Sequence, residues 1–85
     1  MQERALLIKK LIYQSDKRGC KETDIILGRF SAAHLHKMSD GELEDYRHFL
    51  SQLDSDIWDW VNDKAQASDK ACARIVSMIK AGAST

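Results

Sequence analysis

Apolar residues recur at intervals of three and four along the chain, and no proline interrupts them. That interval places side chains on one face of an α-helix, whereas the alternation typical of strands is absent. The spacing predicts five helices: residues 3–17, residues 22–36, a third that begins after Ser39 and carries Leu53, residues 55–63 and residues 69–81. We therefore expect an all-α, compact five-helix bundle, a single domain over residues 1–85 with a frayed tail at about 82–85.

Local signals mark where two of these helices begin. Ser39-Asp40-Gly41-Glu42 is a capping box, in which the Ser39 hydroxyl accepts from the Glu42 amide and the Glu42 side chain reaches back. Ser68 is the expected N-cap of the last helix. These start signals support the helix pattern independently of the apolar spacing.

The spacing also predicts which side chains of the later helices are buried. The buried face of the third helix is expected to comprise Leu43, Tyr46, Leu50 and Leu53. In the fourth helix, Trp60 falls between apolar neighbours in angle and is expected in the core. Trp58 points about 100° away from that face and is expected to be half-exposed, which makes it a candidate for contact with a partner.

Charge is balanced over the whole chain but not along it. Lys and Arg number 13, as do Asp and Glu, so no bulk basicity favours a nucleic-acid partner. Residues 1–37 carry a balance of +4 and residues 38–63 a balance of −7. The uneven spread fits either ordinary solvated faces or a dipolar surface that orients a protein partner.

No set of residues indicates an active site or a metal site. His34 and His36 lie two residues apart and point to different sides of a helix. The acidic run that begins at Asp54 has Asp59 where a calcium loop needs glycine, and Ala65 where it needs glutamate. Neither cysteine has a second Cys or His at zinc-ligand spacing. We therefore expect no catalytic residues, no metal and no stably bound cofactor.

The turn between the first two helices carries the remaining signal. Lys17 and Arg18 close the first helix with cations, and Gly19 stands where a left-handed C-terminal cap is expected. Taken alone, this pattern is that of an ordinary helix–turn–helix corner. It is expected to leave Arg18 and Glu22 exposed, so that replacing either by alanine changes the melting temperature little.

Three motifs of the chain resemble those of one family, the SdhE-type succinate dehydrogenase FAD assembly factors. Arg18-Gly19-Cys20-Lys21-Glu22 matches the family's Arg-Gly-x-x-Glu signature, and Ser39-Asp40-Gly41-Glu42 its Ser-Asp-x-Glu helix start. The segment from Asp54 to Trp60 is similar to its Asp-x-Asp-hydrophobic-x-x-Trp element. The resemblance covers nearly the whole chain. Two residues depart from it: Cys20 replaces a usual Met, and Ser55 stands where many members have Pro.

The resemblance implies a non-enzymatic, chaperone-like role. Members are five-helix proteins that bind the flavoprotein subunit of succinate dehydrogenase and promote covalent attachment of FAD to it. By the motif match, the partner-binding residues are Arg18, Gly19 and Glu22, with Asp24 as a weaker candidate. The FAD belongs to the client, and fumarate reductase is a further possible client. The chain itself is expected to be a monomer.

Two other readings of the sequence stay open. The first is a generic helical interaction or regulatory domain with an unrelated partner, and the second is a self-sufficient flavin transferase. The longest apolar run is four residues, Ala5 to Ile8, so no membrane insertion is expected. The N-terminus lacks secretory and transit patterns, which predicts a cytoplasmic chain, or a trimmed one in the mitochondrial matrix.

Overall fold

The computed structural model describes residues 2–19 and 21–83, and these residues form five α-helices and a short 3-10 helix, with no strand among them. This confirms the expected all-α bundle. The elements are α1 (Gln2–Asp16), α2 (Lys21–His34), η1 (Leu35–Lys37), α3 (Asp40–Leu50), α4 (Asp54–Val61) and α5 (Lys70–Ala83).

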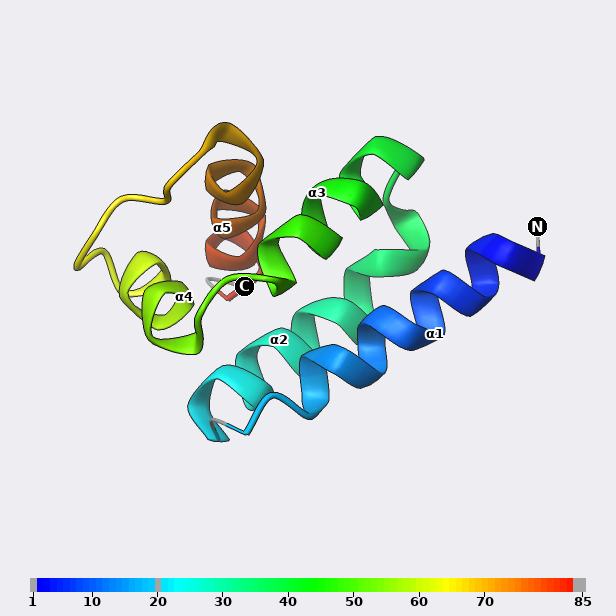
Figure 1. Ribbon diagram of the computed structural model, residues 1–85, viewed down its shortest axis with the longest axis horizontal. Helices are drawn as coiled ribbons and strands as arrows, with labels where there is room; N and C mark the ends of the chain where they lie inside the picture. Colours follow the sequence, from blue (N-terminus) through cyan, green and yellow to red (C-terminus); the bar gives the residue numbers. More distant parts are fainter. Residues whose placement is uncertain (1, 20, 84–85) are drawn as a thin grey trace.

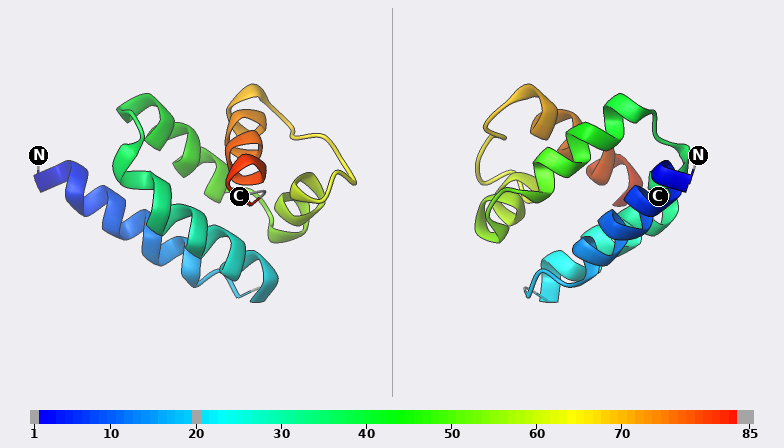
Figure 2. Two further views of the ribbon diagram at one scale, coloured as in Figure 1. Left: turned by 180° about the vertical axis from the view of Figure 1, so that it is seen from behind. Right: turned by 45° about the vertical axis from the view of Figure 1, so that its right-hand side comes forward.

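The helices form two packed groups (Figure 1). Helices α1 and α2 lie side by side as an antiparallel hairpin, and α3 and α5 pack against each other on one side of it. Figure 2 shows the same arrangement from two further directions, with α4 beside α5 and close to the start of α2. No helix of the described residues is long and apolar enough to cross a membrane.

The hydrophobic core lies between the α1–α2 hairpin and the α3–α5 pair, and every helix contributes to it. Trp60 is 6% exposed, and its ring lies 6.3 Å from that of Phe49, which confirms that it belongs to the core. The Tyr46 hydroxyl is also buried and hydrogen-bonded to Ser15 Oγ, which in turn donates to the Leu11 carbonyl at 2.7 Å. This buried polar link joins α3 to α1. Burial raises the pKa of Tyr46 to about 12.

The capping box at the start of α3 is confirmed. Ser39 Oγ accepts from the Glu42 N–H at 3.2 Å, and Glu42 Oε1 accepts from the Ser39 N–H at 2.8 Å. The second bond, made to the charged carboxylate, lowers the pKa of Glu42. Local sequence was sufficient to predict this feature because both partners lie within one helical turn.

Three expectations about the helix ends were wrong. Leu53 is 69% exposed, because α3 ends at Leu50 and Leu53 has an extended backbone at the start of α4. Asp69, and not Ser68, caps α5, since its Oδ1 accepts from the Cys72 N–H at 2.8 Å. The expected tail begins too early: α5 continues to Ala83, and residues 84–85 lie outside the described part.

Gly28 lies in the interior of α2, beside the end of α1. A Cβ atom built at Gly28 would collide with the carboxylate of Asp16, at the end of α1. The atoms that it would meet belong to the end of an exposed side chain, which can turn away. Gly28 therefore leaves room for the Asp16 carboxylate in its present position beside α2.

Candidate functional site

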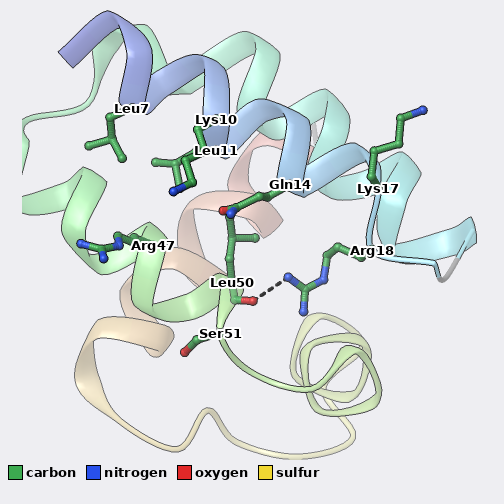
Figure 3. Close-up of a pocket in the computed structure, with 9 residues that line it drawn as sticks. All are labelled: Leu7, Lys10, Leu11, Gln14, Lys17, Arg18, Arg47, Leu50 and Ser51. Atoms are coloured by element: carbon green, nitrogen blue, oxygen red, sulfur yellow. Dashed lines mark hydrogen bonds between the residues drawn. The ribbon is translucent and has the colours of Figure 1, made fainter. Parts of the chain in front are cut away.

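Arg18 reaches across from the end of α1 and holds the turn between α3 and α4. Its Nη1 donates to the Leu50 carbonyl at 2.6 Å, and its Nη2 donates to the Gln52 carbonyl at 2.7 Å. Its Nε forms an ion pair with Asp54, the first residue of α4. Figure 3 shows the guanidinium directed at the Leu50 carbonyl. One side chain therefore binds the end of α3, the loop and the start of α4.

The expectation that Arg18 is exposed was wrong. Its side chain is only 12% exposed and that of Asp54 is 29% exposed. The expectation that Arg18→Ala leaves the melting temperature unchanged rested on that exposure, and its physical basis is therefore lost. The three acceptors lie 32 to 36 residues further along the chain, so no local pattern indicates them.

The same ion pair joins two motifs that are far apart in the sequence. Arg18 belongs to the Arg-Gly-x-x-Glu signature, and Asp54 opens the Asp-x-Asp element of α4. The opposite charges of Arg18 and Asp54 are the sequence feature from which this contact between the two motifs could have been predicted. We therefore regard the two motifs as one structural unit, the Arg18 corner, made of Arg18, Gly19, Asp24 and the turn of residues 50–54.

Asp24 fixes the backbone of this corner. Its Oδ1 accepts from the Arg18 N–H at 3.0 Å, and its Oδ2 lies 3.4 Å from the Gly19 nitrogen, which donates to it. Gly19 has φ +99°, which confirms the expected left-handed conformation. Because α1 ends at Asp16, however, Gly19 lies within the turn and not directly after the helix. A Cβ atom at Gly19 would meet nothing within 4 Å, so this point of the corner is open.

Glu22 and Trp58 lie near the corner on different helices. Glu22 is exposed in the first turn of α2, as expected. Trp58 is half-buried on α4, one helical turn beyond Asp54, which confirms the expected partial exposure. Their proposed contacts with a partner stay predictions. Of the two residues that depart from the family pattern, Ser55 is exposed on α4 and Cys20 lies outside the described residues.

A groove lies between α1 and α3 next to the Arg18 corner, with a volume of about 610 Å³. Its wall contains apolar residues from both helices and four cations (Figure 3). No sequence pattern indicates it, because α1 and α3 are distant in sequence and Arg47 of α3 lies in a segment whose net charge is negative. The lining residues are Leu7, Lys10, Leu11, Gln14, Lys17, Arg18, Arg47, Leu50 and Ser51.

Three potential metal ligands meet where α3 ends and α5 begins. Ligand atoms of His48, Asp69 and Cys72 all lie within 4.8 Å of one another. Asp69 is already engaged twice, with Oδ1 capping α5 and Oδ2 lying 2.7 Å from His48 Nε2. Its hydrogen bond from the Cys72 N–H lowers the pKa of Asp69 to about 2, whereas burial raises the pKa of the Cys72 thiol to about 12. The cluster therefore fits a hydrogen-bonded junction between two helices better than a metal site or a nucleophile.

Comparison with known proteins identifies relatives that include several eukaryotic proteins named mitochondrial succinate dehydrogenase assembly factor 2. The Dictyostelium discoideum protein is 36% identical over 74 residues, which is 87% of this chain and 52% of the relative. The Candida glabrata and Saccharomyces cerevisiae proteins are each 48% identical over 59 residues, which is 69% of this chain. The chain spans 39% and 36% of the lengths of these two relatives. No solved structure matches the chain.

The family comparison covers most of the chain. A model of the family described as "flavinator of succinate dehydrogenase" matches residues 9–83. The matched region includes all three motifs, the whole Arg18 corner and the groove residues from Lys10 onward. It also confirms the resemblance noted from the sequence. The chain belongs to the family of flavinators of succinate dehydrogenase.

Proposed function

We propose that the chain is an assembly factor that binds the flavoprotein subunit of succinate dehydrogenase and promotes covalent attachment of FAD to it. The observation that carries the proposal is the family match over residues 9–83, which includes Arg18, Gly19 and Glu22. The reading as a generic interaction domain with an unrelated partner is not favoured by this match.

The family match supports action by binding. Burial raises the pKa of the Cys72 thiol to about 12, so this thiol is not a poised nucleophile. In the proposed role, the bond to FAD forms within the client, and FAD stays with the client. The chain contributes only its preference for the client conformation in which that reaction occurs.

The size of that preference sets a requirement on the interface. A binding protein shifts a conformational equilibrium only by the difference in its affinity for the two states. Moving a client from 1% to 99% in the competent state takes about 5.5 kcal/mol of differential binding. A few well-packed contacts of a rigid surface supply energies of this order.

The residues in the corner and beside it have distinct parts in this proposal. Arg18 acts as a positioning residue, since its donors are used within the chain. Gly19, open on one side, lets the client backbone approach closely. Glu22 offers a carboxylate to the client, Asp24 keeps the corner rigid, and the exposed part of Trp58 extends the contact to α4.

The proposed role also sets where the chain acts and with what. It acts as a monomer in the compartment of the client, which is the mitochondrial matrix or the bacterial cytoplasm. The mitochondrial names of the relatives support the first of these. Fumarate reductase is proposed as a second client.

A complementation experiment tests the proposal. A strain that lacks the gene is supplied with wild-type chain, Glu22→Ala, or Glu3→Ala as a control at an exposed acid on α1. Covalent flavin on the denatured flavoprotein subunit is measured by in-gel fluorescence. We expect wild type and Glu3→Ala to restore the signal and Glu22→Ala to fail while remaining folded. An undiminished signal in the strain without the gene would contradict the proposed function.

A further inference from the structure

The groove between α1 and α3 combines an apolar floor with a cationic rim (Figure 3). Leu11 and Leu50 form the floor and are almost fully buried, and partly buried Leu7 extends it. In Figure 3, Lys10 points from α1 toward α3 and Arg47 lies opposite on α3, whereas Lys17, just after α1, points away from α3. All three of these cations are exposed.

No carboxylate is among the described residues that line this groove. Lys10 and Lys17 form no ion pair within the described part of the chain, and Arg47 has only a loose one, at 3.7 Å, with exposed Glu44. Near Arg47 in sequence, Asp45 pairs with Arg74. Asp16, next to Lys17, has its carboxylate against Gly28 of α2 and does not line the groove. In a chain of zero net charge, the groove is therefore a local region of uncompensated positive potential.

The shape and chemistry of the groove suit a peptide segment. Leu7 and Gln14, which both line the groove, are seven residues apart on α1, which corresponds to about 10 Å along the helix axis. About three residues of an extended peptide span this distance. Such a segment could place an apolar side chain on the leucine floor and carboxylates against the rim, as positive and negative surfaces do across protein interfaces.

We propose that this groove binds an acidic, apolar-containing segment of the client flavoprotein. The proposal rests on the proposed function and extends it. Arg18 lines one end of the groove and also forms the corner, so the two surfaces are continuous. The groove attracts and orients the client electrostatically, while the corner makes the short-range contacts. The groove and the Arg18 corner together therefore form one proposed interface with the client.

Charge reversal at the rim tests the groove against a matched control. The double variant Lys10→Glu/Arg47→Glu is compared with Lys37→Glu/Lys64→Glu, which makes the same change in net charge at exposed lysines outside the groove. Affinity and association rate for the purified flavoprotein subunit are measured at several salt concentrations, and circular dichroism checks that each variant is folded. We expect the rim variant to lose about tenfold or more in affinity, to associate more slowly and to lose most of its salt dependence. The control variant should lose much less.

Three outcomes would overturn the proposal. If rim and control variants bind equally while Gly19→Arg weakens binding, the groove has no part in the interface and the proposed function stands. If wild-type chain does not bind the flavoprotein, the proposed function fails and the groove proposal fails with it. If the isolated chain binds pyrophosphate in calorimetry and the rim variant does not, the groove holds phosphate groups in place of a peptide segment.

Discussion

Removing the Arg18 side chain should destabilise the fold strongly, although Arg18 lies in a turn. Arg18→Ala deletes the donors to the Leu50 and Gln52 carbonyls and leaves Asp54 without its cation. Hydrogen bonds from charged groups contribute about 1.5–3 kcal/mol each when they are protected from water. Because these acceptors are only partly buried, water replaces some of the loss, and we expect a total cost of about 2–4 kcal/mol.

The melting temperature shows this loss directly. For a domain of this size, 1 kcal/mol corresponds to about 4–8 °C, so Arg18→Ala should melt about 8–32 °C below wild type. Arg18→Lys keeps the charge but not the planar set of donors, and it should fall between the two. Thermal unfolding is followed by far-UV circular dichroism. Lys17→Ala, at the adjacent exposed cation, is the control and should change stability by less than about 0.5 kcal/mol.

A double-mutant cycle separates the ion pair from the carbonyl contacts. Arg18→Ala, Asp54→Ala and the double variant are compared by denaturant unfolding, and the two substitutions should be strongly non-additive because the side chains are in contact. If Arg18→Ala has the same melting temperature as wild type and Lys17→Ala, the guanidinium does not stabilise the turn. The corner would then be an exposed surface feature, and the structural argument for Arg18 would be wrong.

Four further results are expected. Gly19→Arg should cost about 1–2 kcal/mol of stability, because Gly19 has φ +99°, but should reduce client affinity far more, as comparison of melting and binding curves would show. Ser39→Ala should cost about 0.5–2 kcal/mol in urea unfolding through loss of the cap, and an unchanged midpoint would refute the capping role. Burial raises the pKa of Tyr46 from 10.0 to about 12, so the stability that its neutral form contributes should be complete below pH 10 and lost between pH 10 and 12, and Tyr46→Phe should lack this loss. The pKa of Asp69 is lowered from 3.8 to about 2, so its contribution should be complete above pH 4 and decline as pH falls toward 2, and Asp69→Asn should remove this part of the acid dependence.

Local chemistry was sufficient to predict much of the fold. Ser39 and Glu42 lie within one turn, so the capping box could be predicted from four consecutive residues. The left-handed Gly19 and the buried Trp60 were also predicted correctly, because each depends on backbone conformation or helical phase nearby. Leu53 was predicted wrongly, since the helical phase holds only to the end of α3, and the sequence around Leu50 contains no glycine or proline that marks this end.

Tertiary contacts limited the prediction of the site. The sequence indicated Arg18 as important, but its role depends on carbonyl groups of Leu50 and Gln52, which any residue type would supply. No sequence pattern encodes the position of a backbone carbonyl in space. Likewise, Lys10 and Arg47 face each other across the groove only because α1 packs against α3. The motifs therefore indicated the residues of the corner. The contacts of Arg18 within the corner and the adjoining groove could be identified only from the three-dimensional structure.

Reconstitution from purified components tests the central proposal most directly. Flavoprotein subunit produced without covalent flavin is mixed with FAD, with and without an equimolar amount of this chain, and acid-stable flavin on the subunit is measured over time. The proposed function predicts faster or more complete covalent attachment with wild-type chain, a clear loss with Glu22→Ala, and no flavin bound to the chain itself. Attachment at the same rate and to the same extent without the chain would contradict it.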